Sequence, residues 1–227
     1  DAVMAFNQVN VMYPIVTVKQ AAKGSNSVQF GDWTKLTSSN VTEATEATTT
    51  TAVALTSTAR TATVSEHVIA ATVSDLVQMG SGDDIASEGG AALGNAVAAK
   101  LDADLTALGT GFSQTQSSAG TALALSHVFG AMRLLRAASA PFPYSLVLSP
   151  RQVWGPKGLL GLLHDEAVTG SNSKPMSLLG NKGEDAMAGW VGSIAGFDVR
   201  WSDQINEDVG SGGDAAGFAM SKGAIGL

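Results

Sequence analysis

The residues best suited to acid–base or metal chemistry are three histidines, His67, His127 and His164. They are far apart in sequence, and none lies in the HExxH or Cys/His spacing of a zinc site. His164 precedes Asp165 and Glu166, a cluster that could support hydrolysis, but no nucleophile motif accompanies it. The pattern favours structural roles for His67 and His127 and a solvated helix end at His164.

The nearest approach to a catalytic serine is the string WVGSIAG at residues 190–196. A nucleophile elbow requires G-x-S-x-G, and Val191 stands where its first glycine belongs. Ser193 is therefore interpreted as an ordinary turn residue. Neither G-x-x-x-x-G-K-[ST] nor G-x-G-x-x-G occurs, so a phosphate cradle has no support. We expect no catalytic residue and no cofactor.

Oxygen ligands for calcium are present in the loop that contains Asn206, Glu207, Asp208 and Asp214. Their spacing fits neither an EF-hand nor a nonapeptide repeat, which favours an acidic surface loop without metal. Asn40-Val41-Thr42 is a formal glycosylation sequon, but such triplets are common by chance and nothing else indicates secretion. No metal site is predicted.

Composition limits the class of protein. The chain has 227 residues, 44% of them hydrophobic, which is enough for one domain or one domain with an extension. A formal charge of −7 argues against general nucleic-acid binding through a basic surface and suits a container better. The absence of cysteine excludes disulfides. The longest apolar runs, such as 91–99, are too short to cross a membrane.

The segment between Thr34 and Met79 is the most unusual part of the chain, because it contains no glycine, proline or aromatic residue. Threonine supplies 11 of the 27 residues from Thr37 to Thr63. Such β-branched residues favour strands. We predict two long strands, roughly 28–56 and 60–72, in a projecting hairpin. Alternation of Ala62, Val64 and Val68 with polar residues predicts that the second is half-buried.

Large apolar residues are scarce in this segment, so it has little with which to build a core. They are Leu36, Val41, Val53, Leu55, Val64, Val68 and Ile69. A long β-prone arm that cannot bury itself needs partner chains. The sequence therefore favours assembly over catalysis.

A long helix is predicted from about Ile85 to Leu108, after a turn at 80–82. Ser81 or Asp83 is suited to cap its N-terminus, and Gly109 is suited to end it. Its apolar stripe, with Asp102 and Asp104 off the stripe, consists of Leu93, Val97, Leu101, Leu105 and Leu108. At roughly 36 Å it would be a structural spine.

Elsewhere the elements are shorter. Residues 1–30 are predicted to form an extended arm with a strand near 15–18, because Pro14 argues against a helix. After the spine we predict a helix over 121–139, a buried strand over 144–148 and a helix from Pro150 towards Leu163. A loop over 170–189 and strands near 194–201 and 218–220 complete a compact α/β unit. The buried side of helix 121–139 is expected to contain Leu125, Val128, Phe129, Met132 and Leu135.

The chain has four tryptophans that could act as large packing residues: Trp33, Trp154, Trp190 and Trp201. Of these, Trp154 and Trp201 are expected in the core. Trp33, beside Phe30, is predicted to lie at the root of the arm, packing either against a neighbouring chain or against the arm's own base. The residues we expect at contacts between subunits are Trp33, Val53, Leu55, Arg60 and Val64.

Five segments together resemble the major capsid proteins of tailed bacteriophages, which have the Hong Kong 97-type capsid fold. They are EHVIAATVSDLV, the spine DDIASEGGAALGNAVAAKLDADLTALGTGF, PYSLVLSPRQVWGPKGLLGLL, GSIAGFDVRWSDQI and AAGFAMSKGAIGL. The likeness covers about residues 20–227. It lies in the order of the elements and in their general residue pattern, and it includes no active-site signature.

The resemblance implies an α+β fold with four parts. These are an N-terminal arm (1–26), an extended β-loop that overlaps the next subunit (27–73), a peripheral domain (74–120) with spine helix 83–109, and an axial α/β domain (121–227). The family normally continues past the AIGL-like segment, so either the chain is trimmed or its peripheral sheet is completed differently. Some relatives cross-link a loop lysine; Lys23 and Lys35 lie near the loop, but nothing identifies their partner.

The function implied is that of a structural subunit, not an enzyme. Copies would form hexamers and pentamers of the phage head, assembled in the host cytoplasm, and would enclose DNA without sequence-specific binding. A decoration protein is a further candidate partner, and no membrane is involved. Two alternatives stay open: an encapsulin-type nanocompartment shell, and a Thr-rich surface-layer or adhesin protein. The latter is disfavoured by the α/β C-terminal half and the missing signal peptide.

Overall fold

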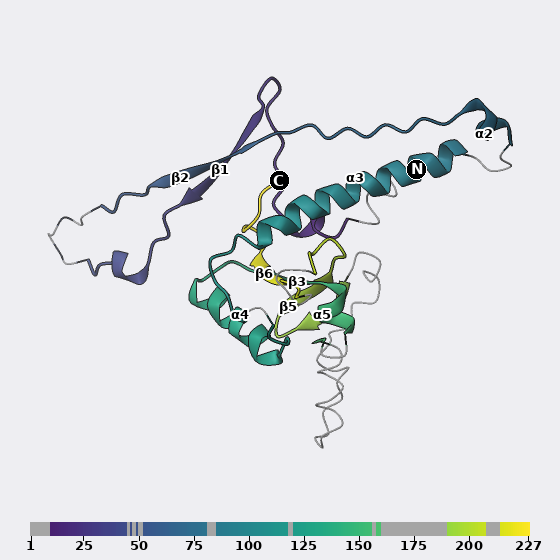
Figure 1. Ribbon diagram of the computed structural model, residues 1–227. Coiled ribbons are helices and arrows are strands. Elements are labelled where there is room, and N and C mark those ends of the chain that lie inside the picture. Colours follow the sequence, from purple (N-terminus) through teal and green to yellow (C-terminus); the bar gives the residue numbers. More distant parts are fainter. Residues whose placement is uncertain are drawn as a thin grey trace, which may run out of the picture. The chain divides into compact units, whose positions relative to one another are not determined.

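The computed structural model describes residues 10–44, 46, 49, 52–80, 85–117, 120–155, 158–159, 190–207 and 214–227. The chain divides into two compact units (Figure 1). The hairpin unit comprises residues 18–66 and 226–227, and the spine–sheet unit comprises residues 1–17 and 67–225.

The hairpin unit is built on two antiparallel strands, β1 (Ser27–Trp33) and β2 (Ser57–Thr63). They pair from Ser27–Thr63 to Trp33–Ser57. The predicted hairpin is therefore present, but strands as long as 28–56 and 60–72 were wrong. A 3₁₀ turn, η2 (Ser38–Asn40), interrupts the first, because the Asn40 side chain accepts a hydrogen bond from the Thr37 N–H at 2.8 Å.

The half-buried pattern predicted for the second strand was also wrong. All seven residues of β2 are exposed, on both faces. The base of the unit is closed by Lys19, whose N–H donates to the Leu227 carbonyl at 2.7 Å. Its Nζ lies 4.9 Å from the Phe30 ring centroid, and Gly226 packs against the same ring. The contacts of Lys19, Phe30 and Gly226 therefore hold the base of this unit together, whereas strand β2 is not covered by a hydrophobic core.

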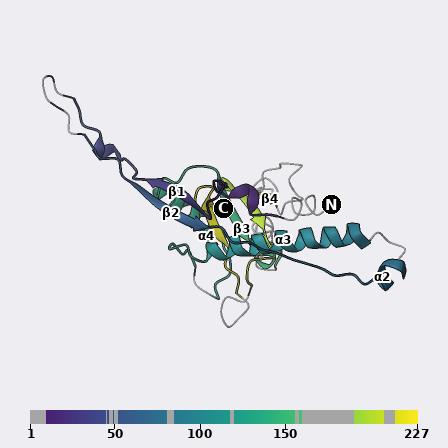
Figure 2. The same cartoon turned by 90° about the horizontal axis from the view of Figure 1, so that it is seen from above.

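The spine–sheet unit contains α2 (Asp75–Gly80) and the long helix α3 (Ile85–Gly109), which confirms the predicted spine (Figure 2). The predicted apolar stripe is confirmed only in part: Leu105 is buried, Leu93 and Leu101 are half-buried, and Val97 and Leu108 are exposed. The face that is buried consists of Gly94, Ala98, Asp102, Leu105, Thr106 and Gly109. These are mostly small or polar residues. The spacing of the large apolar residues therefore predicted burial of the adjacent face of the helix instead.

The N-terminal segment packs in this unit through a short 3₁₀ helix, η1 (Tyr13–Ile15), and not through the predicted strand. Pro14 is compatible with η1 because it lies in the first turn, where no backbone N–H is needed. Met12 and Val16 are buried. The Thr17 N–H donates to the Ile225 carbonyl at 3.0 Å, which ties this segment to the C-terminal end of the unit.

A four-stranded sheet with the order β4-β5-β3-β6 forms the rest of the core. Its strands are β3 (Tyr144–Leu148), β4 (Trp190–Ile194), β5 (Phe197–Trp201) and β6 (Phe218–Ser221). The predicted strands at 144–148 and 218–220 are confirmed, and all five residues of β3 are buried. β3 runs parallel to β5 and antiparallel to β6.

The single strand predicted near 194–201 is in fact the hairpin β4–β5. Its two-residue turn is Ala195–Gly196, with positive φ of 52° and 86°. Ser193 lies in β4, paired with Asp198, so its interpretation as a turn residue was wrong. Positive φ values at both central positions suit this tight reversal, and the turn leaves Ser193 one residue inside the strand.

The helices beside the sheet are α4 (Leu125–Ala137) and α5 (Pro150–Trp154). Val128 is buried, and Leu125, Met132 and Leu135 pack against the core as predicted. Phe129 is 54% exposed, so its assignment to the core was wrong.

α5 starts at Pro150 as predicted but does not continue through Gly155, whose ψ of 162° is extended. Trp154 is 61% exposed, contrary to its predicted place in the core. Trp201 is half-buried against the core cluster. The Trp190 side chain, residues 160–163 and the predicted loop 170–189 lie outside the described residues.

Candidate assembly surfaces

The histidines do not meet in the part of the chain that is described. His67 Nε2 lies 3.7 Å from Asp104 Oδ2, and Lys100 Nζ lies 2.6 Å from Asp104 Oδ1, all at the exposed surface. His127 Nδ1 accepts a hydrogen bond from the Ala124 N–H at 3.2 Å, which supports the start of α4. His164, Asp165 and Glu166 lie outside the described residues. The contacts of His67 and His127 are those of structural residues.

The acidic residues considered as calcium ligands serve different segments. Glu207 Oε1 accepts a hydrogen bond from the Arg151 N–H at 3.1 Å, at the start of α5. Asp214 Oδ2 accepts one from the Gly120 N–H at 2.8 Å. Asp208 is outside the described residues. Within the described ranges no group of three or more His, Asp or Glu side chains is placed to hold a metal ion.

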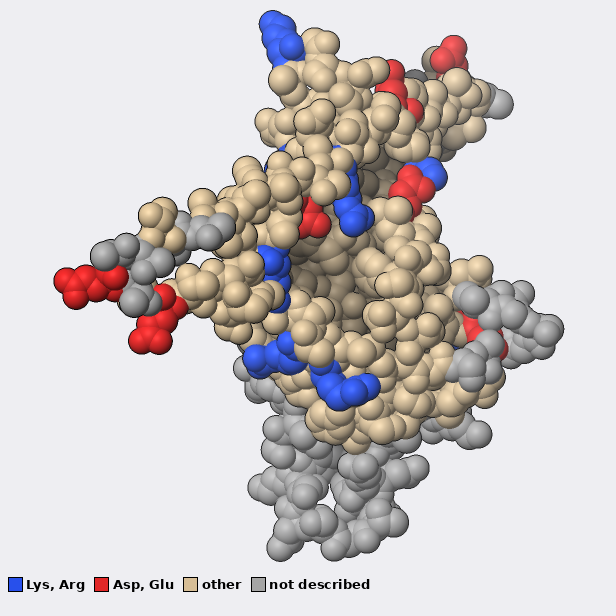
Figure 3. Space-filling model, turned by 90° about the vertical axis from the view of Figure 1, so that its left-hand side faces the viewer, with Lys and Arg blue, Asp and Glu red and all other residues tan. Residues whose placement is uncertain are grey.

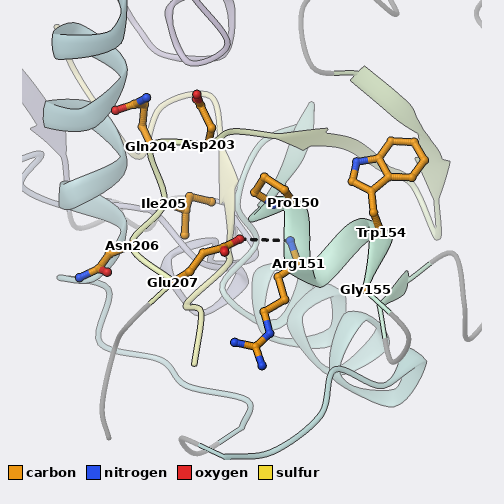
Figure 4. A pocket seen from close by; sticks show the side chains of 9 residues that line it. All are labelled: Pro150, Arg151, Trp154, Gly155, Asp203, Gln204, Ile205, Asn206 and Glu207. Carbon is orange, nitrogen blue, oxygen red and sulfur yellow. Dashed lines mark hydrogen bonds between the residues drawn. The ribbon is translucent and has the colours of Figure 1, made fainter. Parts of the chain in front are cut away.

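A hollow of about 730 Å³ lies between α5 and residues 203–207 (Figure 4). Its lining consists of Pro150, Arg151, Trp154, Gly155, Asp203, Gln204, Ile205, Asn206 and Glu207. Figure 4 shows the Arg151 guanidinium extending away from Asp203. The hollow therefore combines an exposed aromatic ring with exposed carboxylates, a surface suited to a cationic side chain.

A buried carboxylate on α3 organises the spine–sheet unit. Asp102 is only 3% exposed, and its two oxygens accept hydrogen bonds from the N–H groups of Val11 (2.8 Å) and Met12 (3.1 Å). Burial raises the pKa of Asp102, the two hydrogen bonds oppose that rise, and the charge of Asp203 adds to it. The carboxylate satisfies two backbone donors that packing would otherwise leave unpaired.

Thr106, one turn further along the same face, donates to the Ala103 carbonyl at 3.0 Å and the Gln204 carbonyl at 3.3 Å. Asp102 and Thr106 thus fix the N-terminal segment and the wall of the hollow to one helix. Sequence reasoning missed both residues, although their spacing of four on the helix was a usable signal.

The residues predicted to contact neighbouring subunits all belong to the hairpin unit. Trp33 is 62% exposed, and Val53, Leu55, Arg60 and Val64 are also exposed. Trp33 lies at the opposite end of the ladder from Ser27, so its predicted place at the root of the arm was wrong. Their contacts with another subunit stay a prediction.

Charged side chains are sparse on the face seen in Figure 3, where uncharged residues cover most of the surface. None of the helices in the described residues is long and apolar enough to cross a membrane.

The arrangement of these elements is a fold found in bacteriophage structures. A structure from Mycobacterium phage Che8 superimposes with a TM-score of 0.58 at 18% identity, covering 98% of this chain and 75% of that one. A chain in the asymmetric unit of the mature capsid of bacteriophage PhiM1 gives a TM-score of 0.52 at 17% identity, covering 93% and 68%. At these identities the likeness is one of fold. No family model and no curated protein matches the sequence.

Proposed function

We propose that this chain is a structural subunit of a phage head shell, with the Hong Kong 97-type fold, and that it has no enzymatic role. Copies assemble into hexamers and pentamers that close around the genome. The proposal is supported by the fold shared with a chain of the mature PhiM1 capsid. It is also supported by the hairpin unit, whose exposed strands and apolar side chains would be covered by contact with other copies.

The exposed hairpin is the observation that carries the proposal. A two-stranded ribbon is marginally stable alone, because neither face is covered and both edges keep unpaired N–H and C=O groups. β2 buries none of its seven residues within its own chain. Trp33, Leu55 and Val64 expose apolar surface beside it. Laid across a neighbouring subunit, the ribbon gains both burial and strand pairing.

In this proposal the parts of the chain take separate roles. Residues 27–73 are the extended loop that overlaps the next subunit, with Arg60 and Val53 among its contacts. Residues 74–120 form the peripheral domain around the spine helix, and residues 121–227 form the axial domain. The N-terminal arm, 1–26, enters the subunit at the spine, where Asp102 holds Val11 and Met12.

The charge of the chain is consistent with enclosing DNA without binding its sequence. A formal charge of −7 does not favour adhesion to phosphates, so DNA would be retained by the closed wall. The site of action would be the virion head, after assembly in the host cytoplasm. A decoration protein on the outer surface is compatible with this role.

Electron microscopy of the purified full chain tests the proposal. We expect closed, uniform shells from the wild type. A variant in which Leu55 and Trp33 are both changed to serine should keep a folded spine–sheet unit and form few shells. The matched control is Thr42→Ser on the same unit. Wild-type protein that stays monomeric at high concentration would contradict the proposal, and shells filled with a cargo protein instead of DNA would favour a nanocompartment.

A further inference from the structure

One face of α4 carries a stripe of exposed residues that the proposed function does not use. Ser126, Phe129, Arg133 and Arg136 recur at three- or four-residue spacing, which places them on one side of the helix. The opposite side holds Val128 in the core. We call these four residues, together with Phe142, the α4 stripe.

The α4 stripe is held in place by aromatic contacts. The Arg136 guanidinium lies 4.3 Å from the Phe142 ring centroid and 6.0 Å from that of Tyr144. Phe142 and Tyr144 are themselves 4.2 Å apart between centroids. Tyr144 is buried, so the stack is anchored in the core while Phe142 is exposed. A fixed aromatic and cationic surface of this kind loses little entropy on binding.

The stripe is basic in an acidic protein. Neither Arg133 nor Arg136 forms an ion pair with an acidic side chain among the described residues. Figure 3 views the side of the molecule that carries α4 and shows neighbouring basic side chains with no acidic side chain between them. The chain has an overall charge of −7, yet no acidic side chain among the described residues pairs with these two arginines. An acidic surface on a partner would therefore complement the stripe.

The matching surface is the hollow beside α5 on the same unit. Asp203 is exposed and forms no ion pair within the described ranges, while Glu207 contributes a second carboxylate. Trp154, 61% exposed, offers a ring face on which a guanidinium can stack. In Figure 1, α4 and α5 stand on either side of strands β3 and β5, so one copy cannot bring its own stripe to its own hollow.

We propose that the α4 stripe of one copy docks into the α5 hollow of the next, with the arginines of the stripe pairing with Asp203 and stacking on Trp154. Two different surfaces of one chain make a heterologous contact, and repetition of that contact closes a ring when the rotation allows it. The inference rests on the proposed function, because it names the partner surfaces inside each hexamer or pentamer. It is separate from the hairpin contact.

Cross-linking tests the contact directly, because the chain has no cysteine of its own. Ser126→Cys copies are mixed with Asn206→Cys copies and treated with a short bismaleimide. We expect cross-linked dimers in the mixture and not with either variant alone. The matched control replaces Asn206→Cys by Ala107→Cys, on the exposed side of α3, and should give none. Dimers from Ser126→Cys alone would indicate a two-fold contact and overturn the proposal.

A charge swap supplies the second measurement. Arg133→Glu and Asp203→Lys should each abolish oligomers in analytical ultracentrifugation at concentrations where the wild type forms them, and the double variant should regain them. Lys222→Glu makes the same charge change as Arg133→Glu elsewhere on the unit and should have no effect. Normal oligomers from Arg133→Glu, or a double variant no better than the singles, would overturn the contact. The contact would also be overturned if Arg133→Glu reduced the retention of DNA but left the oligomers unchanged.

These outcomes separate the two proposals. A wild type that cross-links through positions 126 and 206 but builds no shells contradicts the shell function and leaves the copy-to-copy contact standing. Shells that form equally well from Arg133→Glu, without the specific cross-link, contradict the contact alone.

Discussion

The carboxylate of Asp102 holds the backbone of Val11, whose N–H donates to Oδ2 at 2.8 Å across 91 residues of sequence. Met12 donates to the other oxygen at 3.1 Å. An ionised carboxylate accepts at both oxygens, whereas an amide accepts at one and donates at the other. The pair therefore explains why an acid is kept on the buried face of the spine helix. It also predicts what happens when the acid is removed.

Asp102→Ala should release the N-terminal segment from α3. Two buried N–H groups would lose their acceptors, so we expect the free energy of unfolding to fall by about 3 kcal/mol. Hydrogen exchange should speed up at Val11 and Met12 first. Asp104→Ala, which removes an exposed carboxylate paired with Lys100, should cost only about 0.5 kcal/mol. Equal losses from the two variants would contradict a specific role for Asp102.

Stability should depend on pH through Asp102. Burial raises its pKa above the ordinary 3.8, against the hydrogen bonds from Val11 and Met12, so the folded chain binds this proton more tightly than the unfolded chain. The stabilising contribution is then fully present below about pH 4 and is lost as pH rises through the raised pKa.

Comparison with Asp102→Asn isolates this dependence, because the variant cannot titrate there. The variant should be least stable relative to the wild type at low pH, and the gap should narrow as pH rises through the raised pKa of Asp102. Urea denaturation of both proteins at each pH measures the gap, with Asp104→Asn as a control for charge loss. A gap that widens with pH would show that the hydrogen bonds outweigh burial.

Gly109, at the end of α3, should not tolerate a side chain. An added Cβ would overlap the ring of Phe218 in β6, which is buried and held edge-on against Phe112 at 5.9 Å between centroids. Gly109→Ala should therefore cost about 1–3 kcal/mol by overpacking. Gly90→Ala, in the same helix with open space around it, should stabilise by about 0.5–1 kcal/mol. Thermal denaturation distinguishes the two, and equal shifts would contradict the packing explanation.

The predicted hairpin contacts should matter to assembly and not to the isolated fold. Val53→Ser and Val64→Ser remove exposed apolar groups that have no core in their own unit. We expect melting of the subunit to change little, within about 0.5 kcal/mol, while the yield of shells falls. Val147→Ser, in the buried strand β3, is the opposite control and should destabilise the subunit itself. A large loss of subunit stability from Val64→Ser would contradict the assembly role.

Several elements could be predicted from the local sequence pattern alone. The leucine spacing located α3, the apolar run located β3, and Pro150 after Ser149 located the start of α5, where Ser149 Oγ accepts the Gln152 N–H at 3.2 Å. These features depend on contacts between residues close in sequence, which the sequence displays directly. Strand lengths in the hairpin were overestimated because capping by Asn40 competes with strand formation.

Residue pattern was sufficient to predict a long spine, a buried strand and a threonine-rich hairpin with too little apolar surface for a core. The buried face of the spine and the exposure of Phe129 and Trp154 could not be predicted in this way, because they depend on packing between distant segments. Periodicity reports where apolar residues lie along a helix. Which face is covered depends on the elements that pack against it from elsewhere in the chain, and here the N-terminal segment brings two backbone N–H donors whose hydrogen bonds Asp102 accepts.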